Sequence, residues 1–98
     1  MPANDSEDHG APPPLPHEHV LFTDLDGREG VLVDLNTKKY YQLNETASLI
    51  WRGLENRSPL SGIAREITEL YNVSLERATA SVETALRNFE AQRLLRTR

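Results

Sequence analysis

The chain has 98 residues, of which 38% are hydrophobic and 27% are charged, and this size and composition fit one small domain with a single core. It has no cysteine, which excludes disulfides, thiolate metal ligands and a cysteine nucleophile and makes a reducing cytoplasm the expected compartment. The formal net charge is −4, and residues 1–17 hold Asp5, Glu7 and Asp8 without Lys or Arg, so the remainder is nearly neutral. This balance disfavours a protein that grips DNA phosphates, and no apolar run is long enough to cross a membrane.

The first segment, MPANDSEDHGAPPPLP at residues 1–16, is polar and then proline-rich. Such a composition buries too little apolar surface to offset the entropy lost on ordering. We therefore expect residues 1–16 to form a disordered tail and residues 17–98 to form the domain.

Next, β-branched, aromatic and Leu residues are interrupted by turn sequences at DGREG and NTKK. This pattern predicts three short strands in a meander, at about residues 18–24, 30–35 and 39–43. In the second strand Val31 and Val33 share one face and Leu32 and Asp34 share the other, so one face is expected to pack and the other to be partly exposed.

Three amphipathic helices follow the predicted strands. Asn44 is expected to cap the first, and Ser58 the second, with Pro59 at its first helical position. Asn72 is expected to end the second helix, and the third is expected to start after Ser74 and to finish within AQRLLRTR. The predicted fold is α+β, a three-stranded antiparallel meander followed by three helices, similar to a winged helix-turn-helix.

The third predicted strand lies at the edge of the meander, with unpaired backbone N–H and C=O groups. It contains two adjacent tyrosines, Tyr40 and Tyr41, which point to opposite faces. One is expected to be in the core, and the other is equally well explained as plain surface. Lys38 and Lys39 also fit simple protection of an edge strand. However, β-augmentation by an extended peptide needs only an open edge and an apolar groove, so aromatic residues here also suit peptide capture.

Two stretches, LPHEHVLFTDLDGREGVLVDLNTKKYYQLNETASLIW and YNVSLERATASVETALRNFEAQRLL, resemble the PqqD-like family, the peptide-recognition elements for ribosomally made, post-translationally modified peptides. The resemblance covers about residues 15–96, and its most specific parts are VLVDLNTKKYYQLN and TASLIW. Within the family, the chain is most similar to the stand-alone leader-binding proteins of lasso-peptide clusters. These usually carry a Gly-Arg-Tyr-aromatic-Gln-Leu-Asn stretch, and here Lys38 replaces the turn glycine, which leaves the register of the hairpin open.

The resemblance implies that a leader peptide binds as a further antiparallel strand beside residues 39–43, in a groove between that strand and the third helix. In lasso-type leaders, a Tyr, a Pro and a Leu fill this groove. The resemblance also favours a role for Lys39 in meeting leader carboxylates. The leader-binding residues expected on this basis are Lys39, Tyr40, Tyr41, Gln42, Leu43, Arg77, Ala78, Ser81, Val82 and Ala85.

The expected partners are a precursor leader peptide and a leader peptidase or another peptide-modifying enzyme, with no nucleic acid and no membrane, and the protein is expected to be a monomer. We expect no catalysis, because there is no Cys, no His in the helical part and no glycine-rich phosphate loop. We also expect no cofactor and no metal, because His9, His17 and His19 lack a ligand partner at metal-site spacing.

Three alternatives stay open. The first, within the family, is a carrier of the precursor of pyrroloquinoline quinone with a radical-SAM enzyme as its partner. The second is a winged-helix DNA-binding protein, although the third helix offers Glu76, Glu83 and Glu90 on the face that would meet phosphates. The third is a domain that docks only to a folded protein.

Overall fold

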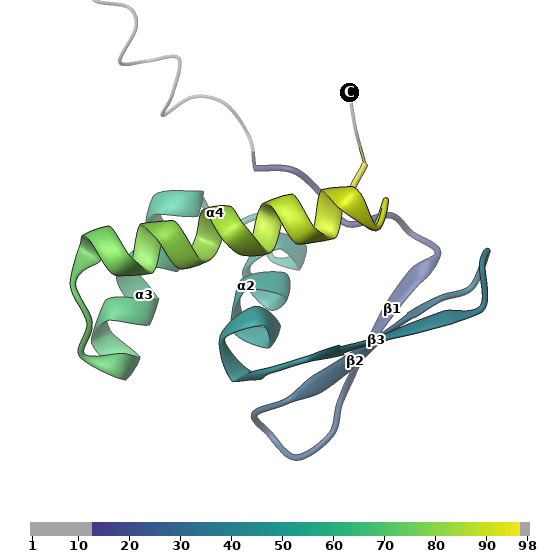
Figure 1. Cartoon of the computed structure of the whole chain (residues 1–98), viewed down its shortest axis with the longest axis horizontal. Coiled ribbons are helices and arrows are strands. Elements are labelled where there is room, and N and C mark those ends of the chain that lie inside the picture. Colours follow the sequence, from purple (N-terminus) through teal and green to yellow (C-terminus); the bar gives the residue numbers. More distant parts are fainter. Residues whose placement is uncertain (1–12, 97–98) are drawn as a thin grey trace, which may run out of the picture.

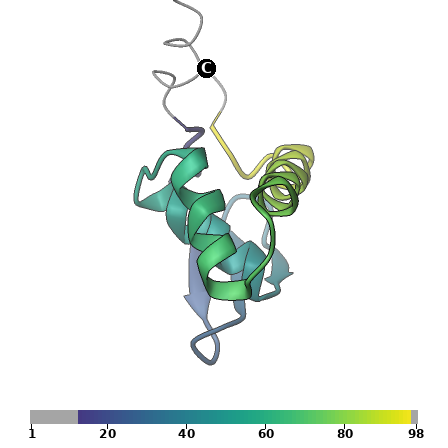
Figure 2. The same cartoon turned by 90° about the vertical axis from the view of Figure 1, so that its left-hand side faces the viewer.

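A computed structural model describes residues 13–96 of the chain. The strands are Val20–Asp24 (β1), Gly30–Asp34 (β2) and Lys39–Leu43 (β3), and the helices are Glu45–Glu55 (α2), Leu60–Tyr71 (α3) and Leu75–Ala91 (α4). The predicted α+β class and the order of three strands before three helices are confirmed (Figure 1). Figure 2, which looks along α4, shows α2 and α3 packed on one side of that helix.

The sheet is an antiparallel meander in the order β1-β2-β3, so β1 and β3 are its two edges. Leu32 of β2 is fully buried and Asp34 is 3% exposed, whereas Val31 and Val33 are only partly buried. The face that carries Leu32 and Asp34 is therefore the one that packs against the helices, and the face that carries the two valines is the outer one. The sequence pattern had left this choice open.

The core lies between this face of the sheet and the helices. Trp51 of α2 is fully buried, and its ring packs edge-on against Phe89 of α4, with the ring centroids 5.1 Å apart. Such an aromatic pair adds to the hydrophobic stabilisation of the helix contact that it makes. The other fully buried large side chains are Leu32, Ile50, Leu54, Ile63 and Leu94.

The helix ends follow local capping rules at most of the predicted positions. The side chain of Asn44 accepts a hydrogen bond from the N–H of Ala47, and the side chain of Ser74 accepts one from the N–H of Arg77. Asn72 has a φ of 55°, the left-handed conformation in which Asn often ends a helix. The predictions for these three residues are confirmed.

The predicted start of α3 is wrong by one residue. Pro59 is not the first helical residue but the N-cap, with an extended ψ of 147°, and it leaves Leu60 to begin the helix. Ser58, the predicted cap, instead donates its backbone N–H to the carbonyl oxygen of Gly53 at 2.9 Å. Ser58 therefore belongs to the turn that ends α2, and α3 has no side-chain cap.

The two ends of the described chain pair with each other. Pro16 forms an isolated antiparallel bridge with Leu95, and the N–H of Arg96 donates to the carbonyl oxygen of Leu15 at 2.7 Å. We expected residues 1–16 to form the tail, but its last residues are held against the end of the chain. The first twelve residues of the expected tail lie outside the described part.

Candidate functional site

Hydrogen bonds of the sheet show which backbone groups of each strand are paired. The N–H of Leu35 donates to the carbonyl oxygen of His19 at 2.9 Å. The N–H of Leu25 donates to the carbonyl oxygen of Glu29, also at 2.9 Å. In an antiparallel sheet, alternate residues direct both backbone groups to the same neighbour, so the odd-numbered residues of β2 bond to β1.

The even-numbered residues of β2 consequently bond to β3. Leu32 lies opposite Tyr41, so the backbone of Tyr41 is paired with β2. The N–H and C=O groups of Tyr40 and Gln42 then point outward from the sheet. Within residues 13–96, these two residues give β3 an open edge with unpaired donors and acceptors, as the meander predicted.

The register of this hairpin depends on the turn before β3. Lys38 has a φ of 65°, the left-handed region in which glycine is favoured because it has no Cβ. The N–H of Lys38 donates to the carbonyl oxygen of Asp34 at 2.7 Å, so the turn closes although lysine occupies the position of the usual glycine.

Asp34 supports the same turn from inside the fold. Its Oδ1 accepts hydrogen bonds from the N–H groups of Asn36 (2.9 Å) and Thr37 (3.3 Å), and Nε2 of His19 lies 3.7 Å from it. Burial raises the pKa of the Asp34 carboxyl, but the N–H donors of Thr37 and Asn36 and the nearby His19 outweigh it, so the pKa is below its usual value. A charged carboxylate therefore fixes the turn that leads into β3.

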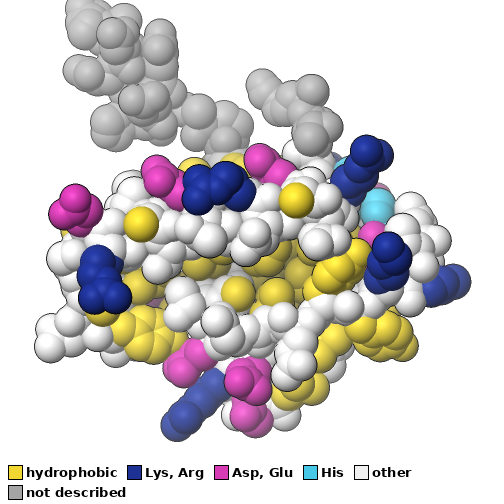
Figure 3. Space-filling view, in the orientation of Figure 1, with side chains coloured by type: hydrophobic (Ala, Val, Ile, Leu, Met, Phe, Trp, Pro, Cys, Tyr) yellow, Lys and Arg dark blue, Asp and Glu magenta, His cyan; other side chains and the backbone are white. Residues whose placement is uncertain are grey.

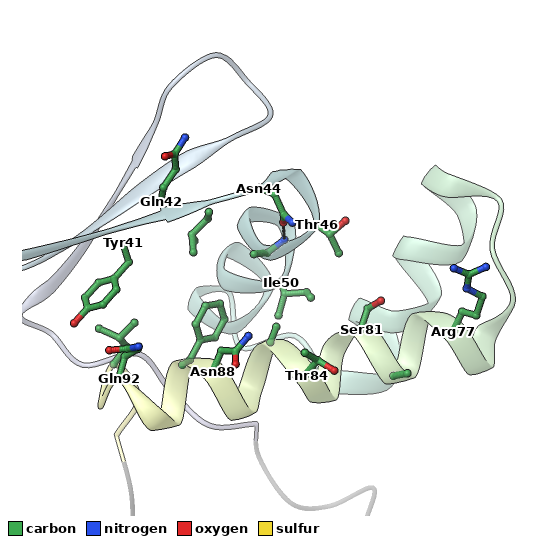
Figure 4. Close-up of a pocket in the computed structure, with 16 residues that line it drawn as sticks. Tyr41, Gln42, Asn44, Thr46, Ile50, Arg77, Ser81, Thr84, Asn88 and Gln92 are labelled. Atoms are coloured by element: carbon green, nitrogen blue, oxygen red, sulfur yellow. Dashed lines mark hydrogen bonds between the residues drawn. The ribbon is translucent and has the colours of Figure 1, made fainter.

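A groove of about 770 Å³ lies beside the open edge, between β3 and α4 (Figure 4). Figure 3 shows hydrophobic side chains along the bottom of this hollow. Its apolar lining consists of Leu43, Ala47, Ile50, Ala85, Phe89 and Leu94. The polar side chains that α4 contributes are Arg77, Ser81, Thr84, Asn88 and Gln92.

The groove is open because α4 presents small side chains to it. Ala80, Ser81 and Ala85, which have short side chains, line its wall. The polar residues Thr84 and Asn88 continue the same stripe at helical spacing. An apolar bottom with polar groups along the rim is the usual character of a binding site.

Six of the ten expected leader-binding residues line this groove, namely Tyr41, Gln42, Leu43, Arg77, Ser81 and Ala85. Lys39 lies instead in a second hollow next to the groove. The side chain of Tyr40 is 72% exposed and, by strand alternation, lies on the outer face of the sheet. Ala78 and Val82 are 0% and 3% exposed, belong to the core and are not among the lining residues.

Part of the groove lining was not expected from the sequence. For α4, the spacing of three and four residues from Arg77 would have found the other positions, because they lie on one helix face. For α2, no sequence signal exists, because its contribution depends on how the helix sits against α4. The missed residues are Asn44, Thr46, Ala47, Ile50, Ala80, Thr84, Asn88, Phe89, Gln92 and Leu94.

Within residues 13–96, no group of three or more His, Cys, Asp or Glu side chains is placed to hold a metal ion. No helix in that range is long and apolar enough to span a bilayer.

Residues 29–95 match the model of the family described as coenzyme PQQ synthesis protein D (PqqD). The chain belongs to the PqqD family. The resemblance found in the sequence is thereby confirmed for the larger part of the chain. No curated protein sequence matches the chain.

Two solved structures have a fold similar to that of this chain. TbiB1, in complex with the TbiA(beta) leader peptide, is 26% identical, with a TM-score of 0.78, and the match covers 86% of this chain and 96% of that one. A lasso peptide synthetase B1, complexed with the leader peptide, is 22% identical, with a TM-score of 0.75, and the match covers 84% and 95%. Both comparisons include nearly the whole of the described domain.

Proposed function

We propose that this PqqD-family protein binds the leader of a ribosomally made precursor peptide by adding it as an antiparallel strand to β3. The observation that carries the proposal is the open edge at Tyr40 and Gln42 directly beside an apolar groove. In β-augmentation the backbone of the edge strand gives affinity, and pockets for alternate side chains give specificity. TbiB1, which shares the fold, is in complex with a leader peptide, and this supports leader binding by the present chain.

The edge and the groove contribute differently to binding. The two N–H and two C=O groups of Tyr40 and Gln42 offer hydrogen bonds worth about 0.5 to 1.5 kcal/mol each, whatever the sequence of the peptide. The apolar lining can recognise the sequence, because side chains of the added strand that point toward α4 enter the groove. Leu43, Ile50 and Phe89 are suited to aliphatic or aromatic residues of a leader.

The role that fits these features is non-catalytic. The groove is lined by aliphatic, aromatic, hydroxyl, amide and guanidinium groups, which suit holding a peptide and form no nucleophile with a base. The protein would then present the captured precursor to a processing enzyme. For a lasso-type precursor, which the likeness to the leader-bound lasso peptide synthetase B1 favours, that enzyme would be a leader peptidase.

A second candidate is favoured by the family match itself. The matched family is described by coenzyme PQQ synthesis, so a carrier of the quinone precursor that works with a radical-SAM enzyme is the runner-up. The mode of capture would be the same, and only the leader and the enzyme would differ.

The direct test is a titration of the fluorescently labelled full chain with synthetic TbiA(beta) leader peptide, a quinone-type precursor peptide and duplex DNA. We expect saturable binding of a leader, stronger for the lasso-type peptide, and none for a scrambled peptide of the same composition. Preference for the quinone-type peptide would select the second candidate. Salt-sensitive binding of DNA, with no binding of either leader, would contradict leader capture.

A further inference from the structure

A second hollow, of about 410 Å³, adjoins the groove at the C-terminal end of α4. Tyr41 and Gln92 line both, so the two hollows are direct neighbours. The second hollow differs in chemistry, because charged and polar side chains dominate its lining. It also contains Lys39, one of the expected leader-binding residues that lie outside the main groove.

The charges around this hollow are mainly positive. Lys39 and Arg93 contribute two permanent cations, and His17 and His19 add imidazole rings stacked with centroids 4.8 Å apart. The carboxylate in the lining belongs to Asp34, whose Oδ1 already accepts two backbone N–H groups of the turn. Figure 3 shows Lys or Arg side chains together with a His at the end of the molecule where α4 finishes.

The direction of the bound peptide decides which of its residues meet this hollow. β3 and α4 run in opposite directions along the groove, with Tyr41 beside Gln92, and with Ser81 and then Arg77 toward the other end (Figure 4). A peptide that is antiparallel to β3 therefore passes Arg77 first and leaves beside Lys39. The residues that directly follow the strand-forming segment of the peptide are therefore the ones nearest to the second hollow.

We propose that the second hollow binds the carboxylate of an Asp or Glu that lies directly C-terminal to the strand-forming segment of the leader. The inference rests on the proposed function and adds to it the position and the charge of one residue of the leader. Lys39 and Arg93 contact the carboxylate, and His17 and His19 serve as donors beside them. Charge complementarity of this kind fixes register, because a peptide shifted along β3 moves its acid away from the cations.

The test uses selection, so no cognate leader has to be known beforehand. The full chain is used to select binders from a displayed library of random peptides, and the same is done with the double variant Lys39→Glu/Arg93→Glu. The matched control is Arg57→Glu/Arg65→Glu, which changes the net charge equally at exposed positions outside both hollows. Arg57, like Arg93, has a positive φ, so the two double variants carry the same backbone constraint.

We expect the unmodified chain and the control to enrich peptides with apolar residues followed on the C-terminal side by Asp or Glu. The double variant should enrich Lys or Arg at that position. Replacing the selected acid by its amide should weaken binding to the unmodified chain by about threefold to tenfold and leave binding to the double variant unchanged within about twofold.

Each remaining outcome counts against a stated part of the proposal. Enrichment of apolar peptides without an acid, or an acid that the double variant still prefers, overturns the charged subsite and leaves leader capture intact. Failure of the unmodified chain to enrich any peptide contradicts leader capture and the subsite together. If the double variant melts early, the milder Lys39→Gln/Arg93→Gln variant replaces it, and it must lose the acid preference.

Discussion

The two edges of the sheet have the same backbone chemistry but different surroundings. At β1, Arg52 of α2 lies over the ring of Phe22 at 5.1 Å and forms an ion pair with Asp24 at 3.3 Å. At β3, α4 faces the strand across the groove and contributes the small side chains of Ala80, Ser81 and Ala85 to its lining. Among the described residues, those of β1 line neither hollow.

This difference shows what turns a strand edge into a docking site. Unpaired N–H and C=O groups occur on both edges and confer no preference between them. Among the described residues, those of β3 line the apolar groove and those of β1 do not, so a peptide added at β3 can gain both backbone bonds and side-chain burial. The preference of a peptide for the β3 edge therefore comes from α4 more than from β3 itself.

The largest expected effects come from proline substitutions along β3, which test the assignment of its backbone groups. Tyr41→Pro removes an N–H from the ladder with β2 and should lower the free energy of unfolding by at least about 2 kcal/mol. Gln42→Pro and Tyr40→Pro should leave most of the stability and weaken leader binding, by about 0.5 to 1.5 kcal/mol for each lost bond. Chemical denaturation of each variant measures its free energy of unfolding, and peptide titration measures its affinity for the leader.

Tyr41→Ala is the control for the proline series, because it removes the ring and keeps the N–H. Its unfolding free energy should lie between those of the natural chain and Tyr41→Pro. If Gln42→Pro unfolds the domain while Tyr41→Pro does not, the parity assigned to β3 is wrong.

The next effect is expected from filling the groove. Ser81 is exposed and lines the groove, so Ser81→Trp should occupy the space and weaken leader binding by at least about tenfold. Thr79→Trp places the same side chain on an exposed part of α4 that does not line the groove, and it should bind normally. Equal affinities for the two variants, measured by fluorescence anisotropy, would show that peptides bind elsewhere.

A smaller effect is expected at the other edge. Arg52→Ala removes the ion pair and the contact with the ring of Phe22, and it should cost up to about 1 kcal/mol of stability because both groups are partly solvated. Leader affinity should not change. A loss of affinity comparable with that of the groove variant would place β1 at the docking site and reverse the comparison.

The smallest effect concerns the turn that sets the register of β3. Lys38→Gly should raise the free energy of unfolding by up to about 1 kcal/mol, because glycine adopts the left-handed conformation without strain from a Cβ. Asn36→Gly, at a position with an ordinary φ, should instead destabilise the domain. Thermal melts of the two variants that shift in the same direction would contradict this account of the turn.

Local features could be predicted from the sequence because their interactions lie within a few residues. Asn44 and Ser74 bond to N–H groups three positions later, and Asn72 ends its helix through its own backbone conformation. Ser58 was misplaced because its partner is Gly53, in the preceding helix. A cap preference alone cannot tell the end of one helix from the start of the next.

The site was less predictable because it depends on contacts between distant segments. Which of Tyr40 and Tyr41 faces the helices depends on the register with β2, and that register is set by the turn at Lys38. On α4, the core residue Val82 and the groove residue Ser81 are neighbours in sequence. Periodicity identifies the apolar stripe of α4 but does not show which part of the stripe is buried in the core and which part lines the groove. The core residues Ala78 and Val82 were therefore included in the expected site.

The most direct test of strand addition at β3 is residue-resolved amide hydrogen exchange, measured by NMR on the full chain with and without a saturating leader peptide. The account predicts that the N–H groups of Tyr40 and Gln42 gain protection when the peptide binds. Tyr41 should be protected in both states, and Phe22 at the opposite edge should not change. Protection gained by Phe22 in place of Tyr40 and Gln42, or no gain at either edge with peptide bound, would contradict the central claim.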